Sequence, residues 1–160
     1  MKKNKELIKI IISWILVITW MIVIFMLSNT NAKDSTNESK KIITDTIVST
    51  TTVTNDIGLT DYHPTDNELK ETVKKLNNPL REIMHSVEYL VLSILLLNAL
   101  KNSNIKKIYL YTFIICIIYI LSDEYHQTFV TGRTFEYIDI FMDTLGMSIG
   151  MFLYKIFKKR

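Results

Sequence analysis

The feature that most constrains this chain is the arrangement of its apolar residues in long blocks, with the charged residues placed between the blocks. The first block, residues 10–27, reads IIISWILVITWMIVIFML and contains no charged side chain. A bilayer core about 30 Å thick is crossed by roughly 20 mostly apolar helical residues, so this block is long enough to span one. Three further blocks follow at residues 87–100, 108–121 and 137–154.

Four such blocks in a chain of 160 residues predict an all-α integral membrane protein, a bundle of about four transmembrane helices. The second and third blocks are short for full spans, and flanking polar residues at the interface or against other helices would complete them. Each block alone could be a buried helix of a soluble protein, but together they leave too little polar sequence to cover them. We therefore expect one membrane domain with spans near residues 10–27, 86–100, 108–122 and 137–154.

A cleaved signal peptide is the competing interpretation of the first block. Lys2, Lys3 and Lys5 would form its basic beginning, and Thr30-Asn31-Ala32 would form its cleavage site. The apolar stretch of a signal peptide usually runs about 7 to 15 residues, and this block is longer. We therefore favour an uncleaved membrane anchor.

The basic residues orient the chain. Eleven of the 19 Lys and Arg residues cluster before the first block, between the second and third blocks, and after the fourth: Lys2, Lys3, Lys5, Lys9, Lys101, Lys106, Lys107, Lys155, Lys158, Lys159 and Arg160. The connections on the other side hold most of the carboxylates. The positive-inside rule therefore predicts that both termini lie in the cytoplasm and that residues 28–84 and 122–136 face outward.

The long outer segment between the first and second blocks is polar. Residues 29–62 are rich in Ser, Thr, Asn and Asp, and we expect much of this stretch to be loosely ordered. A short surface helix over residues 39–53 is an alternative, because Ile42, Ile43, Ile47 and Val48 have nearly helical spacing, but the run of threonines weakens it.

Residues 66–77 are predicted to form an amphipathic helix on the outer surface. Thr65 with Glu68 three residues later reads as a capping box. The apolar face continues through Leu69, Val73, Leu76 and Leu80. An ordinary solvated helix with some apolar contact explains the same pattern, so that alternative stays open.

Ionisable side chains cost about 2.5 to 3.5 kcal/mol each near the centre of a bilayer, so those in or beside the apolar blocks are candidate functional residues. The first group consists of Arg81, His85, Glu88 and Tyr89, at the start of the second block. Because Arg81, His85 and Tyr89 are spaced four residues apart, one helix face carries all three, and Glu88 borders that face.

The second group leaves the third block on the outer side. It runs through residues 123–127, Asp-Glu-Tyr-His-Gln, to Thr131-Gly132-Arg133. Glycine readily adopts backbone conformations that other residues avoid, so Gly132 can form a tight turn that directs Arg133 back toward the membrane.

The third group is the pair Asp139 and Asp143, one helical turn apart in the outer half of the fourth block. Gly146 and Gly150 follow at GxxxG spacing, which suits close helix packing. The predicted orientation places all three groups on the same side of the membrane. A compact bundle would combine them into one outward-facing polar pocket, although each residue alone also has an ordinary structural explanation.

The composition of this pocket indicates its ligand. His85-x-x-Glu88 and Asp123-x-x-His126 each place two metal-ligand types one turn apart, but Arg81 and Arg133 in the same cluster would repel a cation. Arginine binds phosphate and carboxylate bidentately, so we expect an anionic ligand and no metal ion. A net charge of +3 without a basic patch that carries interleaved aromatics argues against nucleic acid. The one cysteine, Cys116, can form no internal disulfide.

Taken together, these residues resemble the pattern of the VanZ-like membrane proteins over essentially the whole chain. Arg81, His85, Glu88 and Tyr89 match the R-x-x-x-H-x-x-E-Y pattern of that family, and residues 123–129 match its D-E-x-H-Q-x-F signature. Thr131-Gly132-Arg133 stands where P-G-R is usual, and Asp139 matches the aspartate that follows. Asp143 departs from the pattern, because asparagine is common at its position.

The resemblance implies a protein of the bacterial plasma membrane with a role in resistance to glycopeptide antibiotics of the teicoplanin type, and a general role in the cell envelope stays open. We expect no cofactor. Our first hypothesis is binding of a lipid-linked cell-wall precursor, the lipoglycopeptide itself or another anionic envelope ligand. The candidate ligand-binding residues are Arg81, His85, Glu88, Tyr89, Asp123, Glu124, His126, Gln127, Arg133 and Asp139.

An intramembrane acid–base enzyme that acts on a lipid-linked wall intermediate is the alternative, with Glu124, His126, His85 and Glu88 as candidate catalytic residues. No nucleophile motif supports it. A transporter ranks third, because the sequence has no inverted repeat and no broken-helix signal. Membrane lipids are expected partners, and the oligomeric state stays open.

Overall fold

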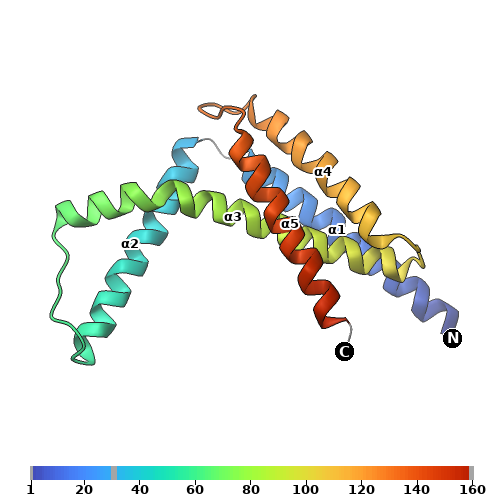
Figure 1. The fold of residues 1–160 in the computed structure, drawn as a ribbon, viewed down its shortest axis with the longest axis horizontal. Coiled ribbons are helices and arrows are strands. Elements are labelled where there is room, and N and C mark those ends of the chain that lie inside the picture. The colour runs from blue at the N-terminus through green and yellow to red at the C-terminus, as the bar shows by residue number, and fades with distance from the viewer. Residues whose placement is uncertain (1, 30–31, 159–160) are drawn as a thin grey trace.

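A computed structural model describes residues 2–29 and 32–158, and these residues form a helical fold (Figure 1). No strand occurs among them, so the predicted all-α class is confirmed. Residues 30–31 of the cleavage site considered above, and Lys159 and Arg160 of the basic C-terminus, lie outside the described residues. In chain order the helices are α1 (Lys2–Ser28), α2 (Ala32–Asp56), α3 (Asp66–Asn102), α4 (Ile108–Gln127) and α5 (Tyr137–Phe157).

Four helical segments are long and apolar enough to cross a membrane. They are Asn4–Ser28, Pro79–Asn102, Ile108–Gln127 and Tyr137–Phe157, and each contains one apolar block of the sequence. The second and third segments reach 24 and 20 residues because their helices continue through the flanking polar residues. The chain therefore has the helices of a multi-pass membrane protein.

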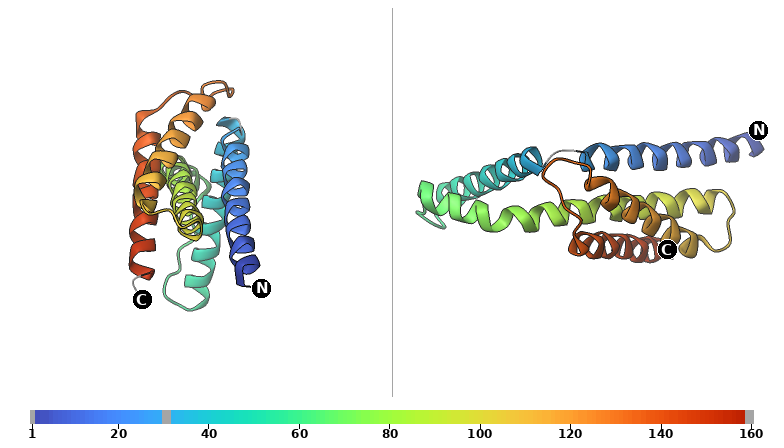
Figure 2. Two further views of the ribbon diagram at one scale, coloured as in Figure 1. Left: turned by 90° about the vertical axis from the view of Figure 1, so that its right-hand side faces the viewer. Right: turned by 90° about the horizontal axis from the view of Figure 1, so that it is seen from above.

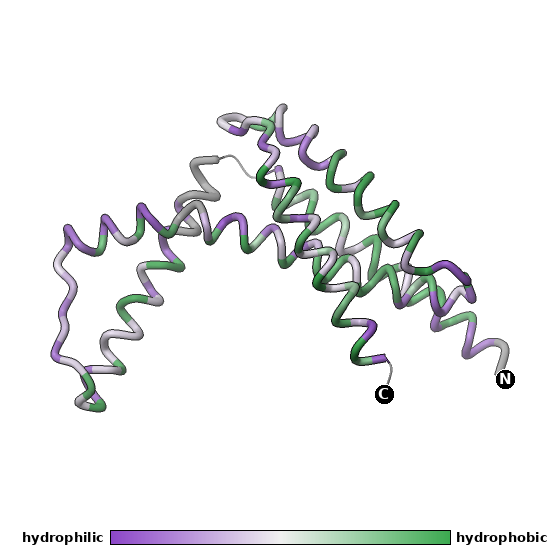
Figure 3. The backbone as a smooth tube through the Cα atoms, viewed as in Figure 1, coloured by the Kyte–Doolittle hydropathy of each residue, from purple (hydrophilic) through white to green (hydrophobic). Residues whose placement is uncertain are grey.

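Helix α3 is the central element of the bundle. Its C-terminal half packs against α1, α4 and α5 (Figures 1 and 2). Half of its membrane-spanning window is buried in the protein, against 17% for α1, which leaves most of α1 for lipid contact. Figure 3 shows hydrophobic residues along the spans and hydrophilic residues at their ends. The buried core combines Val17, Ile24, Tyr89, Leu92, Leu96, Ala99, Cys116, Ile120 and Met147.

The segment that follows α1 differs from the sequence-based expectation. Much of residues 29–62 was expected to be loosely ordered, but α2 is a continuous helix from Ala32 to Asp56. Its hydroxyl side chains fit the helix because they donate to carbonyls four residues earlier, as Thr46 does to Ile42 and Ser49 to Asp45. Helix α2 packs against the N-terminal half of α3, and the two form a hairpin that projects from the bundle (Figure 1).

The helix predicted over residues 66–77 is not a separate element. It is the first part of α3, which continues through Pro79 to Asn102 over 37 residues. The capping box is confirmed: the backbone N–H of Thr65 donates to Glu68 Oε2 at 2.9 Å, and that of Glu68 donates to Thr65 Oγ1 at 3.4 Å. The bond from the Thr65 backbone N–H, and a second from the Thr65 hydroxyl to the same carboxylate oxygen at 2.8 Å, lower the pKa of Glu68. Pro79 removes one backbone donor without ending the helix.

The backbones of α3 and α5 touch at two glycines. A Cβ atom added at Gly146 would overlap the backbone carbonyl of Ser86, and one added at Gly150 would overlap the carbonyl of Leu90. Across the same contact, Ser86 Oγ donates to the carbonyl oxygen of Met142 at 2.9 Å. The close packing predicted from the GxxxG spacing is therefore present, and α3 is its partner.

We predict that Gly146→Ala separates α5 from α3, because the added methyl group meets backbone that cannot rotate away. Overpacking a tight contact costs roughly 1 to 3 kcal/mol, so the thermal midpoint of the purified protein should fall. Ile149→Ala is the matched control, because Ile149 is exposed on the same helix. Equal midpoints for Gly146→Ala and the wild type would contradict the observed packing.

Candidate functional site

The three polar groups identified in the sequence meet at one end of the bundle, which we call the polar end. Helices α1 and α4 finish there, α5 begins there, and α3 enters the bundle there (Figures 1 and 2). The opposite, lysine-rich end carries the start of α1, the α3–α4 connection and the end of α5. Buried ionisable groups at the polar end come from three helices and include His85, Glu88, Asp123, Glu124, Asp139 and Asp143.

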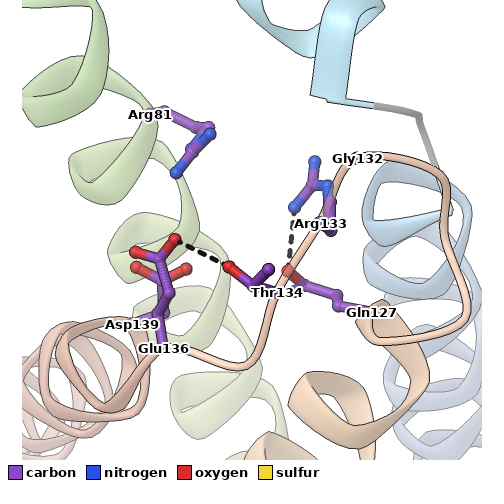
Figure 4. A pocket seen from close by; sticks show the side chains of 7 residues that line it. All are labelled: Arg81, Gln127, Gly132, Arg133, Thr134, Glu136 and Asp139. Atoms are coloured by element: carbon purple, nitrogen blue, oxygen red, sulfur yellow. Dashed lines mark hydrogen bonds between the residues drawn. The ribbon is translucent and has the colours of Figure 1, made fainter.

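A small pocket opens between α3, the end of α4 and the start of α5 (Figure 4). Its volume is about 30 Å³, which is enough for one water molecule. Arg81 and Arg133 approach the opening from two sides, and the carboxylates of Glu136 and Asp139 lie beside it (Figure 4). The pocket is lined by Arg81, Gln127, Gly132, Arg133, Thr134, Glu136 and Asp139.

The turn between α4 and α5 positions Arg133. Gly132 has a φ of 81°, and the backbone N–H of Arg133 donates to the carbonyl of Val130 at 3.1 Å. The tight turn predicted at Gly132 is therefore present. Arg133 Nη1 donates to Gln127 Oε1 at 2.9 Å, and Gln127 Nε2 donates to Asp123 Oδ2 at 3.1 Å. This chain of hydrogen bonds ties the arginine to the last turns of α4.

The surroundings of Arg133 make it suitable for an anionic group. Its side chain is half-buried, and this burial lowers its pKa. The positive charge of Arg81 acts in the same direction, whereas Asp123, Asp139 and Glu124 raise the pKa. A guanidinium stays charged under all these influences. An anion placed between the two arginines would relieve their mutual repulsion and replace lost hydration.

Glu124 fastens the start of α5 to the end of α4. Its side chain is buried, and its Oε1 accepts the backbone N–H of Glu136 at 2.6 Å. Glu136 directly precedes α5, and a negative charge at the beginning of a helix is favourable. Thr134 Oγ1 donates to the Glu136 side chain at 3.3 Å. Glu124 therefore holds in place the connection that carries Arg133.

A second layer of ionisable groups lies deeper between α3 and α5. His85 Nδ1 is 3.5 Å from Glu88 Oε2, and both side chains are buried. Asp143 is close enough to interact electrostatically with both. Within the described residues, one carboxylate oxygen each of Asp139 and Asp143 has no hydrogen-bond partner. Buried polar atoms are rarely left unpaired, so these oxygens mark a place for a proton or for a donor group.

Six of the ten predicted ligand-binding residues do not line the arginine pocket: His85, Glu88, Tyr89, Asp123, Glu124 and His126. His126 packs against Phe25, with ring centroids 4.6 Å apart, and lines a separate aromatic cavity of about 280 Å³. Tyr89 is fully buried in the core, and its ring centroid lies 6.2 Å from that of Tyr119. Asp123 connects the two regions, because it lines the aromatic cavity and accepts from Gln127.

Sequence reasoning missed two residues of the pocket, Thr134 and Glu136. Both lie in the connection before α5, and the only signal was their position between Arg133 and Asp139. Glu136 contributes its backbone N–H, which donates to Glu124, as well as its side chain. A sequence motif describes side chains, so it cannot reveal such a backbone contact. Across residues 2–29 and 32–158, no three His, Cys, Asp or Glu side chains lie close enough together to hold a metal ion.

The fold and the polar end define a helical, multi-pass membrane protein with a buried cluster of ionisable groups beside a two-arginine pocket. The model of the family described as VanZ/LLP1 matches residues 13–158, and the chain belongs to this VanZ-like family. The resemblance inferred from the sequence is thereby confirmed over nearly the whole chain. No curated protein and no solved structure matches the chain.

Proposed function

We propose that this protein binds an anionic, lipid-linked envelope ligand at its polar end and thereby contributes to resistance against teicoplanin-type glycopeptides. The observation that carries the proposal is the placement of Arg81 and Arg133, from segments far apart in the sequence, on two sides of one opening (Figure 4). Two guanidinium groups around one opening suit a phosphate or carboxylate. The resistance role follows the family to which the chain belongs.

The carboxylates of the pocket narrow the ligand class. Glu136 and Asp139 line the same opening as the arginines. Carboxylates repel a bare anion, but they accept hydrogen bonds from hydroxyl groups. A lipid-linked saccharide phosphate offers both chemistries, with phosphate oxygens for the arginines and sugar hydroxyls for the carboxylates. This pairing favours a cell-wall precursor over a simple inorganic anion.

The pocket must open for such a ligand. Its volume of about 30 Å³ holds a water molecule but no phosphate group. Arg133 is held by Gln127, whereas no hydrogen bond to Arg81 occurs within the part of the chain that the structure describes. We therefore expect the side chain of Arg81, and not that of Arg133, to move when the pocket opens. The Arg81 side chain would swing outward and close over the phosphate, while the saccharide stays outside the bundle.

We further propose that the polar end faces outward in a bacterial plasma membrane, with both termini in the cytoplasm. The polar end lies opposite the end that carries Lys101, Lys106, Lys107, Lys155 and Lys158 (Figure 1). Basic connections stay on the cytoplasmic side of bacterial membrane proteins. Teicoplanin-type drugs act at the outer face, where this orientation presents the two arginines.

Thiol labelling tests this orientation. Cys116 is the one native cysteine and is buried, so it should not react with a maleimide. A membrane-impermeant maleimide added to intact cells should label Tyr62→Cys, between α2 and α3. Lys106→Cys, at the lysine-rich end, should be labelled only after the membrane is permeabilised. The reverse pattern would refute the proposed orientation.

Drug susceptibility tests the arginine site. The wild-type chain, expressed in a susceptible Gram-positive host, should raise resistance to teicoplanin, and Arg133→Ala should abolish the increase. Truncating one member of a buried charged contact costs about 2 kcal/mol or more, which is roughly a 30-fold loss of affinity. Lys75→Ala is the matched control, because Lys75 is exposed on the projecting half of α3.

All variants must reach the membrane in equal amounts for this comparison. Undiminished resistance with Arg133→Ala would exclude the arginine from the function. Unchanged susceptibility with the wild-type chain would exclude the resistance role for this protein in that host.

An acid–base enzyme is the second candidate function, and the buried pair of His85 and Glu88 favours it. Their side chains are 3.5 Å apart, so a proton can pass between the imidazole and the carboxylate. However, neither residue lines the arginine pocket, and Glu124 is already engaged by the amide of Glu136. Mass spectrometry of the wall precursors separates the two candidates. A chemically altered precursor pool that depends on His85 would replace the binding role with an enzymatic one.

A further inference from the structure

A second basic cavity lies at the lysine-rich end, on the far side of the bundle from the arginine pocket. It has a volume of about 410 Å³ and is formed by the end of α3, the connection into α4 and the end of α5. Lys101, Lys155 and Lys158 supply its charge. Ile105, Ile108 and Tyr109 supply apolar surface, and Tyr154 completes the lining.

Among the described residues, no carboxylate balances the positive charge of this cavity. No carboxylate lines it, and among the described residues no acidic side chain lies within ion-pair distance of its three lysines. Lys158 is held against Tyr154 at the cavity, because its Nζ bonds the hydroxyl of that residue and lies 4.4 Å from the centroid of its ring. Three like charges gathered around one cavity repel one another unless an anion enters.

The level of the cavity indicates where the anion comes from. Three membrane-crossing segments end or begin at its lining, at Asn102, Ile108 and Phe157. This is the depth at which lipid headgroups meet the hydrocarbon core. Lysine and tyrosine are typical of that boundary, because each combines an apolar stem or ring with a polar tip. The apolar residues of the lining can accommodate the glycerol and the first part of the acyl chains.

We propose that this cavity is a binding site for an anionic phospholipid, with the headgroup phosphate between Lys101, Lys155 and Lys158. The site is independent of the proposed envelope-ligand function, because it shares no residue with the arginine pocket and lies at the other end of the spans. The bound lipid would join the end of α3 to the end of α5, so we expect it to stabilise the protein.

Lipid-induced thermal stabilisation tests the proposal. The purified full-length protein in neutral detergent is titrated with phosphatidylglycerol, and the apparent affinity is taken from the rise of the thermal midpoint. Each lysine near an anionic lipid contributes about a fivefold factor in affinity. The triple variant K101Q/K155Q/K158Q should therefore bind roughly 100-fold more weakly. The control K106Q/K107Q removes two charges from the same end outside the cavity and should keep near-wild-type affinity.

Other outcomes would overturn the proposal. Equal affinity in the triple variant and the wild type, or an equal loss in the control, would show that the cavity does not select the lipid. Equal stabilisation by phosphatidylcholine, or by soluble glycerol phosphate, would show that the ligand is not an anionic phospholipid. If the triple variant does not fold, the single variant Lys155→Gln replaces it, because Lys155 is exposed. Its apparent affinity for phosphatidylglycerol should fall about fivefold. An unchanged affinity would contradict the proposed site.

Discussion

The close contact of α5 with α3 at Gly146 and Gly150 determines where the ionisable groups of the spans lie. No side chain separates the two backbones at these glycines, because a Cβ would overlap the carbonyls of Ser86 and Leu90. Asp143 and Asp139 lie about one and two helical turns before Gly146. The same contact therefore places them within electrostatic range of His85 and Arg81 on α3.

Grouping these charges at one end of the bundle lowers the free-energy cost of burying them and gathers the polar groups of the candidate binding site. Buried carboxylates are costly, and the protein satisfies some of them with its own donors, such as the amide of Glu136 for Glu124 and the side-chain amide of Gln127 for Asp123. One carboxylate oxygen each of Asp139 and Asp143 has no hydrogen-bond partner among the described residues. A bundle that served only to hold itself together would pair or omit them, so these oxygens support the proposal that the polar end binds a ligand.

The sequence predicted those features that depend on local pattern. Apolar blocks gave the spans, the glycine spacing gave the close helix contact, and Thr65 with Glu68 gave the start of α3. Prediction from the sequence failed where tertiary packing determines the structure. Helix α2 forms despite its threonines, because Ile43 is buried where α2 packs on α3. Helix α3 likewise continues through Pro79. The sequence also could not place His126, because which face of α4 meets the bundle depends on partners that local spacing does not specify.

The central claim is that segments far apart in the chain meet in one pocket at the polar end, and cysteine cross-linking in membranes tests it most directly. In a Cys116→Ala background, the pair Arg81→Cys and Thr134→Cys should be joined by a short bifunctional thiol reagent, because both positions line the pocket. Lys106→Cys with Thr134→Cys should not be joined, because Lys106 lies at the other end of the bundle. Failure of the first pair to cross-link, with each cysteine singly reactive, would contradict the account.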